Sequence, residues 1–155
     1  MIVLTIVVIL LAMAMPMMRN LIMNQHVKTG VTDLQTALYF ARSEAIKRAT
    51  DIVVAPVSSD WKNGWTVKAG TTLIRTQGAL DSGLSTKTTA TTLTYRADGR
   101  LTTAPAAPSG TPAGTVAVLY VAGSTTVTPR CVLLDLSGRP SAAMDTDNNG
   151  ANGCN

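Results

Sequence analysis

The sequence VKTGVTDLQTALYFARSEAIKRA, residues 27–49, decides the fold. Its apolar side chains recur at intervals of three and four residues: Val27, Val31, Leu34, Leu38, Ala41 and Ala45. This spacing places them on one face of a helix. Glu44 and Arg48 add an i,i+4 ion pair in the favourable order, and Gly30 is a tolerated weak point. We therefore predict an amphipathic helix over residues 19–50 whose apolar stripe packs on a sheet of the same chain.

Upstream lies MIVLTIVVILLAMAMPMM, residues 1–18, in which sixteen residues are apolar and none is charged. As a helix this run would be about 27 Å long, close to the roughly 30 Å hydrocarbon core of a bilayer. We predict that it is a transmembrane and assembly helix, continuous with the amphipathic part through a kink at Pro16. Thr5, Ala12 and Ala14 are the small or weakly polar residues that close helix packing uses.

A cleaved signal peptide is the alternative for residues 1–18. Ala12-Met13-Ala14 has the small-x-small form of a cleavage site, but no basic residue precedes the apolar run. In that case the mature protein would be a periplasmic binding domain, with an intact mass that begins after Ala14.

After Thr50 the apolar period changes from 3.6 to two. Six strands are predicted, at residues 51–57, 65–69, 71–76, 91–96, 115–121 and 131–136. Residues 68–71 and Asp98-Gly99 give hairpin turns, and the Pro-, Ala- and Gly-rich residues 104–114 give an exposed loop. The fold class is therefore α+β, with one long N-terminal helix packed on an antiparallel sheet in a globular domain over residues 51–155.

The composition argues against several classes of protein. The chain has 155 residues, of which 46% are apolar and 14% are charged, and its net charge is +4. This charged fraction is too low for a disordered chain or a coiled coil. The basic residues are also scattered along the chain, which argues against a strong electrostatic footprint for nucleic acid.

Cys131 and Cys154 flank a tail that is rich in Asn, Asp and Gly and poor in apolar anchors. We predict a disulfide between them, with two unrelated thiols as the alternative. The bridge would close a loop of about 24 residues and contribute about 3 kcal/mol in the chain-entropy treatment. A disulfide would place the domain in an oxidising compartment.

Several of these segments together resemble type IV pilin-like proteins, in particular the minor pilins and pseudopilins of the FimT, FimU and GspH kind. The matching segments are the apolar run that ends at Pro16, ALYFARSEAIKR (37–48), DWKNGW (60–65), TYRADGRL (94–101) and CVLLDLSGRP (131–140). The family also has a basic leader, a Gly cleavage site and a mature start like Phe-Thr-Leu-Ile-Glu. We expect that part of the pattern to lie upstream of Met1, so processing and N-methylation are assigned to no residue here.

The resemblance implies a pilin fold and a structural subunit of a type IV pilus or type II secretion system. Such a subunit is not an enzyme, binds no cofactor and has no small-molecule substrate. Its partners would be other pilins or pseudopilins, the bacterial inner membrane and the assembly machinery. Its globular domain would lie in the periplasm, and its hydrophobic helix would drive assembly.

Four arginines, Arg96, Arg100, Arg130 and Arg139, fall near predicted strand ends and turns, where they could form one basic patch. Members of the FimT kind that take up DNA carry a C-terminal Gly-Arg-x-Arg motif. Here the matching residues are Gly-Arg-Pro-Ser at 138–141, so the second arginine is absent. Phosphate contacts need several cations held together. A DNA-binding minor pilin for natural transformation is therefore an alternative function.

Asp145, Asp147 and Asn149, followed by Gly150, match the first positions of a calcium loop. The sequence supplies no Glu at the twelfth position, so we favour a loop of Asx turns closed by the disulfide over a calcium site. No other metal site is predicted, since two Cys and one distant His cannot build a tetrahedral cluster.

No catalytic constellation stands out in the sequence. His26 is the only histidine, and no nucleophile or orienting group accompanies it, so we interpret it as a solvated helix residue. Carboxylates are too dispersed for an acid–base pair, and no glycine-rich phosphate loop is present. Trp61 and Trp65 are interpreted as a buried structural corner and not as a ligand platform.

Overall fold

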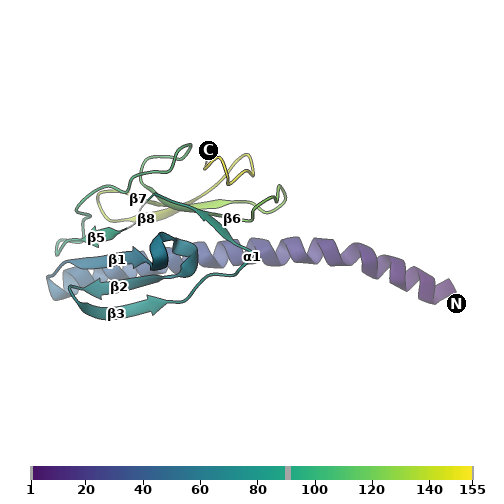
Figure 1. The fold of residues 1–155 in the computed structure, drawn as a ribbon, viewed down its shortest axis with the longest axis horizontal. Helices are drawn as coiled ribbons and strands as arrows, with labels where there is room; N and C mark the ends of the chain where they lie inside the picture. Colours follow the sequence, from purple (N-terminus) through teal and green to yellow (C-terminus); the bar gives the residue numbers. More distant parts are fainter. Residues whose placement is uncertain (1, 90–91, 155) are drawn as a thin grey trace.

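The structure, a computed structural model, describes residues 2–89 and 92–154. At the N-terminal end it describes the side chains of Val3 and of residues from Met18 onward. A single helix, α1 (Ile2–Arg48), runs through Pro16 without interruption. About half of it projects beyond the globular domain as a bare, gently curved rod (Figure 1).

Within residues 2–89 and 92–154, eight strands form two four-stranded sheets, and the strands pair antiparallel. The first sheet has the order β3-β2-β1-β5, with β1 (Ile52–Pro56), β2 (Trp65–Ala69), β3 (Thr72–Gln77) and β5 (Leu93–Tyr95). The second has the order β4-β6-β7-β8, with β4 (Ser85–Lys87), β6 (Thr115–Tyr120), β7 (Arg130–Leu134) and β8 (Pro140–Met144). Two short 3-10 turns, η1 (Val57–Ser59) and η2 (Trp61–Asn63), join β1 to β2. The predicted α+β class is confirmed, with the strands divided between two sheets.

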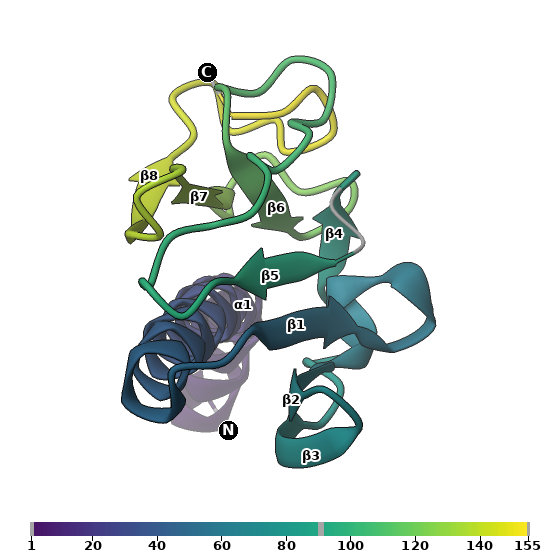
Figure 2. The same ribbon diagram turned by 90° about the vertical axis from the view of Figure 1, so that its left-hand side faces the viewer.

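The predicted apolar stripe of α1 forms the helical side of the core of the domain. Its six residues are each at most 3% exposed, and Ala37 joins them. A view down the helix shows β1 and β5 beside one flank of α1, and β7 and β8 beside another (Figure 2). The predicted ion pair at the end of the helix is also present, with Arg48 Nε 2.6 Å from Glu44 Oε2.

Gly30 lies where β6 of the second sheet packs on the helix. A Cβ atom built at this position would be 2.8 Å from Cδ2 of Leu119 in β6 and 3.3 Å from Cδ1 of Leu80. The missing side chain therefore lets β6 approach the helix backbone. Gly30, which the sequence indicates as a weak point in the helix, is therefore a position where the helix packs on a strand.

Two of the observed strands, β4 and β8, are not predicted from the sequence. β4 has three half-buried residues, and β8 consists of Pro, Ser, two Ala and Met, so neither has the β-branched alternation of a typical strand. The predicted strand at 131–136 ends at Leu134 because a turn follows, in which the Gly138 N–H donates to the Asp135 carbonyl at 3.0 Å. Position 91, the predicted start of another strand, is outside the described residues.

The turn at Asp98-Gly99 forms, with Gly99 at a φ of 75° and its N–H donating to the Arg96 carbonyl at 2.8 Å. It does not join two strands, because only the single bridge between Tyr95 and Leu101 follows it. The predicted turn between β2 and β3 is confirmed, with Gly70 at a φ of 57°.

The second sheet is covered on both faces. In β6 the residues from Thr115 to Leu119 are all buried, which explains an apolar run that lacks polar alternation. Its inner side packs with α1, and its outer side carries a second cluster made by Val118, Cys131 and Cys154.

Replacement of Leu34 by Ala tests the dependence of the domain on the helical stripe. Leu34 is fully buried, so we expect the free energy of unfolding to fall by about 2–5 kcal/mol. Thr36→Ala, at an exposed position on the same helix, should change it by less than about 0.5 kcal/mol. Denaturant unfolding followed by circular dichroism measures both, and equal effects would contradict the role of the stripe.

Candidate functional site

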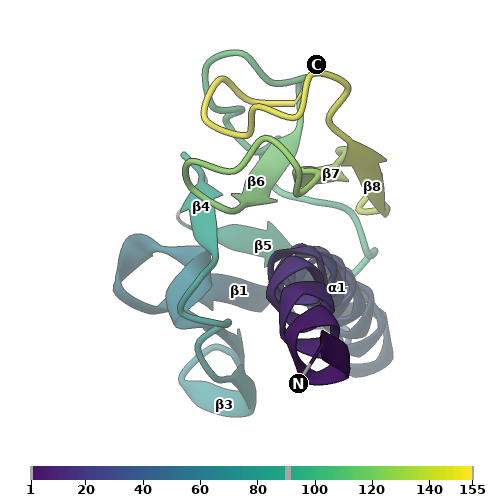
Figure 3. The same cartoon turned by 90° about the vertical axis from the view of Figure 1, so that its right-hand side faces the viewer.

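The projecting half of α1 exposes apolar side chains. Met18 and Leu21 are each 57% exposed, Ile22 is 44% exposed, and Val3 near the N-terminus is 75% exposed. Figure 3, seen from this end, shows the helix emerging in front of both sheets without any other element around it. An exposed apolar surface of this kind indicates contact with another apolar phase or another protein.

Among the residues that the structure describes, no helix has the length and hydropathy needed to cross a membrane. The predicted transmembrane segment, residues 1–18, stays a prediction, because the structure describes few of its side chains. The same holds for the side-chain contacts of Thr5, Ala12, Ala14 and Pro16, whose backbone is part of α1.

Two loops hold α1 where it leaves the domain. In the crossover between the sheets, residues 78–84, Gly83 packs so closely on Met23 that a Cβ atom would be 3.2 Å from its sulfur. In the loop between β6 and β7, the Thr128 N–H donates to Asn24 Oδ1 at 3.0 Å. These contacts fix the point at which the bare helix begins.

His26 is part of the same junction and is not simply solvated. Its Nδ1 is shielded from solvent and lies 3.1 Å from Asp81 Oδ2, at ion-pair distance but without the alignment of a hydrogen bond. Asp81 Oδ1 also accepts the Gly83 N–H at 2.9 Å. This hydrogen bond, with a smaller contribution from His26, holds the pKa of Asp81 below its usual range.

A cavity of about 370 Å³ opens between α1 and the crossover loop. Asp33 and Asp81 give it two carboxylates, and Leu80 and Leu84 give it apolar walls. The lining is completed by His26, Thr29, Gly30, Gln77 and Ala79. Neither the cavity nor the partner of His26 can be read from the sequence, because residues 26 and 81 are joined only through the packing of a loop.

The structure brings three of the four predicted arginines to one end of the domain. Gly138 packs on the turn that contains Gly99, where an added Cβ atom would be 2.3 Å from the Gly99 carbonyl oxygen. This contact places Arg139 beside the turn formed by Arg96 and Arg100. The three arginines lie on adjacent turns at the end of the domain where α1 ends.

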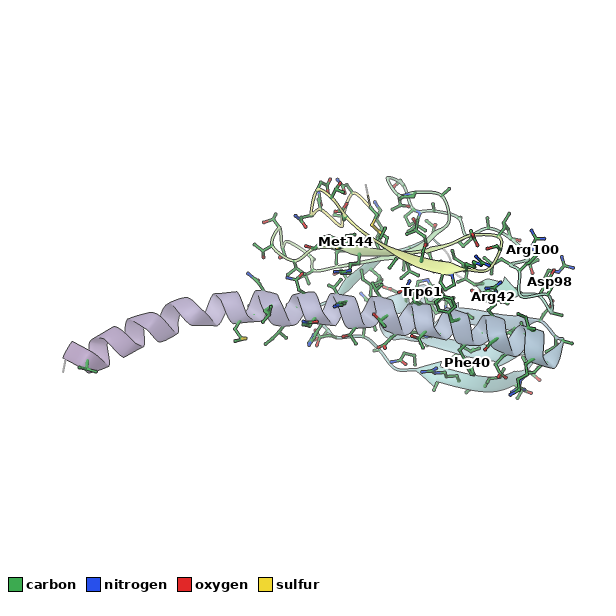
Figure 4. The ribbon with its side chains drawn as sticks, turned by 180° about the vertical axis from the view of Figure 1, so that it is seen from behind. Phe40, Arg42, Trp61, Asp98, Arg100 and Met144 are labelled. Atoms are coloured by element: carbon green, nitrogen blue, oxygen red, sulfur yellow. A yellow bond between two sulfur atoms is a disulfide. The ribbon has the colours of Figure 1, made fainter. Side chains whose placement is uncertain are left out.

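Arg42 joins this end of the domain, although the sequence does not single it out. Its Nε donates to the Gly99 carbonyl at 3.0 Å, and Figure 4 shows Arg42 and Arg100 near each other there. Arg130 lies apart, because it pairs in register with Met144, which Figure 4 places nearer the middle of the helix. Three of the four predicted arginines therefore lie on adjacent turns near Arg42, and we refer to Arg42, Arg96, Arg100 and Arg139 as the arginine patch.

Asp135, a carboxylate beside this patch, accepts hydrogen bonds within its own turn. Asp135 Oδ1 accepts the Ser137 hydroxyl at 2.6 Å and the Arg139 N–H at 3.2 Å. These hydrogen bonds, the hydroxyl first, hold the pKa of Asp135 below its usual range. Tyr95 is buried nearby, and burial raises its pKa.

The Asp- and Asn-rich loop is held by its own side chains. Asp145 Oδ2 and Asp147 Oδ1 each accept the Asn149 N–H at 2.9 Å, and Asp147 Oδ2 accepts the Asn152 side-chain amide at 2.6 Å. Among the described residues no three His, Cys, Asp or Glu side chains are grouped to hold a metal ion. The contact from the Asn149 N–H to Asp147 Oδ1 is that of an Asx turn and supports this interpretation of the loop, whereas the calcium alternative stays a prediction.

Cys131 and Cys154 form the predicted disulfide. The bridge lays the C-terminal tail across the outer face of the second sheet. Lys87 Nζ donates to the carbonyls of Ser109 and Ala151, both at 2.9 Å, and so joins the Pro-rich loop to the same tail.

Trp61 and Trp65 are 0% and 2% exposed, with ring centroids 6.2 Å apart. Asp60 caps the turn between them by accepting the Lys62 N–H at 3.0 Å. The interpretation of a structural corner is confirmed.

The comparisons with known proteins agree with this architecture. Residues 31–138 match the family model of GspH, described as type II transport protein GspH. The chain belongs to the GspH family. Members of this family are structural proteins of the pseudopilin type, so this chain is not an enzyme. No curated protein sequence matches it.

Three solved structures share the fold. The type IV minor pilin FimU of Pseudomonas aeruginosa strain PAO1 is 20% identical, with a TM-score of 0.64 over 81% of this chain and 96% of that one. A second crystal form of FimU gives a TM-score of 0.60 at 20% identity, over 79% of this chain and 99% of that one. The minor pseudopilin EpsH from the type 2 secretion system of Vibrio cholerae is 15% identical, with a TM-score of 0.54 over 77% of this chain and 97% of that one.

Removal of the disulfide should loosen the tail without unfolding the helix. We expect the double variant Cys131→Ser/Cys154→Ser to lose about 3 kcal/mol of unfolding free energy. Denaturant unfolding with and without reductant measures this loss. The wild-type chain in reductant should match the variant, and equal stability of the oxidised and reduced chains would contradict the role given to the bridge.

Proposed function

We propose that this GspH-family protein is a minor pilin or pseudopilin subunit of a type IV pilus or type II secretion system, assembled through the N-terminal half of α1. The observation that carries the proposal is a single helix, buried along one stripe in the domain and bare beyond it. A helix that served only as a membrane anchor would need no rigid connection to the domain. A helix that packs with the helices of other subunits needs one, because the helix then determines how the globular domains are arranged.

In this proposal residues 1–18 lie in the inner membrane before assembly, and the domain lies in the periplasm. The Cys131–Cys154 disulfide supports an oxidising compartment. The partners are other pilins or pseudopilins and the assembly machinery, and the apolar helix exchanges lipid for the helices of those partners. In this proposal the subunit keeps residues 1–18, which are continuous with the rest of α1.

Deletion of residues 1–18 tests the proposal. The shortened chain retains the buried stripe, so we expect a folded, monomeric protein that no longer enters filaments or pseudopilus complexes. Co-isolation of the tagged chain with assembled filaments measures this, with the full chain as the reference. A shortened chain that still assembles, or a native mass that begins after Ala14, would overturn the proposal.

DNA binding is a second candidate, favoured by the arrangement of Arg96, Arg100 and Arg139 at one end of the domain beside Arg42. Contacts with phosphate become stronger when several cations act on one strand. In this case the same subunit would carry DNA as well as assemble.

A mobility-shift assay with the full chain in detergent tests this second candidate. We expect a shift at low salt that weakens steeply as the salt concentration rises. Arg100→Ala/Arg139→Ala should abolish the shift, whereas Arg130→Ala, outside the patch, should preserve it. The absence of any shift at low salt, or equal loss in both variants, would exclude this patch as a DNA site.

A further inference from the structure

We infer that Asn149 is a site of spontaneous covalent modification, at which the backbone nitrogen of Gly150 attacks the side-chain amide and Asn149 becomes aspartate or isoaspartate. The site lies in the loop that follows β8, in the globular domain, and its chemistry does not depend on the proposed assembly through α1.

The reaction needs an asparagine whose next residue has an accessible backbone nitrogen. Glycine allows this best, because it has no side chain to obstruct a close approach. The Gly150 nitrogen forms a bond with Cγ of Asn149, the bond from Cγ to Nδ2 breaks, and ammonia leaves with the proton of the Gly150 N–H. Water then opens the cyclic imide at either of its carbonyls, which gives aspartate or isoaspartate.

The chain contains three Asn-Gly pairs, at residues 63–64, 149–150 and 152–153. The glycine is buried in all three, so its burial does not distinguish the pairs. The hydrogen bonds of the two reacting groups do distinguish them. A pair reacts fastest when neither the glycine nitrogen nor the asparagine amide is held by another group.

Two of the pairs are held. In the first, the Gly64 N–H donates to the Trp61 carbonyl at 3.1 Å, which keeps the attacking nitrogen within the turn η2. In the third, Asn152 Nδ2 donates to Asp147 Oδ2 at 2.6 Å, which fixes the amide that would have to turn. In each case a hydrogen bond must break before the reaction can begin.

The pair Asn149-Gly150 has neither restraint. Within the part of the chain that the structure describes, no hydrogen bond involves the Asn149 side chain or the Gly150 N–H. Asn149 is exposed, and both residues line a cavity of about 260 Å³ between this loop and the loop that follows β6. The side chain therefore has room to turn toward the nitrogen, and water can reach the imide.

The modification changes the charge of the loop. Asp145 Oδ2 and Asp147 Oδ1 both accept the Asn149 N–H. A carboxylate at position 149 is a third negative charge beside these two, and it lowers the net charge of the chain, +4, by one. Like charges at this distance repel, so the product weakens the turns that hold the C-terminal tail.

Incubation of the full chain, in detergent and in isotopically labelled water at mildly alkaline pH, tests the site. Peptide mass spectrometry measures, for each pair, the fraction that has become an acid and carries an oxygen from the labelled water. We expect Asn149 to convert about fivefold faster, or more, than Asn63 and Asn152, which is the effect of one hydrogen bond that must break first.

Matched variants test the reason for this selectivity. Asp147→Ala removes the acceptor that holds the Asn152 side chain, so conversion at Asn152 should rise toward that of Asn149 while conversion at Asn63 stays the same. Asn149→Gln should abolish conversion at position 149 and leave the other two pairs unchanged. In the chain unfolded by denaturant, the three pairs should convert at similar rates.

Equal rates at the three pairs in the folded chain, or a faster rate at Asn63 or Asn152, would overturn the inference. Conversion of Asn149 only after unfolding would also overturn it, and an unchanged Asn152 in Asp147→Ala would contradict the reason given for the selectivity. None of these results bears on the proposed function, which fails only if the chain without residues 1–18 still assembles or if the native mass begins after Ala14.

Discussion

The burial of one helical stripe between two sheets is the interaction on which the rest of this structure depends. Residues from Val27 to Ala45 pack against β1 and β5 on one flank and against β7 and β8 on another. Because one helix completes the core for both sheets, the domain has a single orientation on α1. That orientation determines which sides of the helix remain exposed, and therefore which sides are available to partners.

The helix could be predicted from the sequence because its signal is local. The interval between apolar residues is set by the helical turn, so positions such as Leu34 and Leu38 identify the buried face without knowledge of their partners. The division into two sheets is not local. It depends on β1 pairing with β5 as well as with β2, and on β6 pairing with β4 as well as with β7. Long connections separate β1 from β5 and β4 from β6. β8 cannot be predicted from its own residues, because its pairing with β7 makes it a strand.

The candidate sites also divide into those with a local signal in the sequence and those that depend on contacts between distant residues. The Cys131–Cys154 bridge follows from the spacing and composition of the tail, and the tryptophan corner follows from residue size. Arg42 lies 57 positions from the carbonyl that it contacts, and His26 meets Asp81 through a crossover loop. Contacts of this kind depend on how distant turns come together, so the sequence indicates the arginines but not which of them share a surface.

The direction of the buried stripe has a mechanical consequence. It runs along the axis of α1, so a force that pulls on the bare end of the helix loads the stripe in shear. Because the side chains of the stripe interdigitate with those of the sheets, such a displacement strains the packing along its whole length. The domain thus opposes an axial load on its helix through the entire stripe.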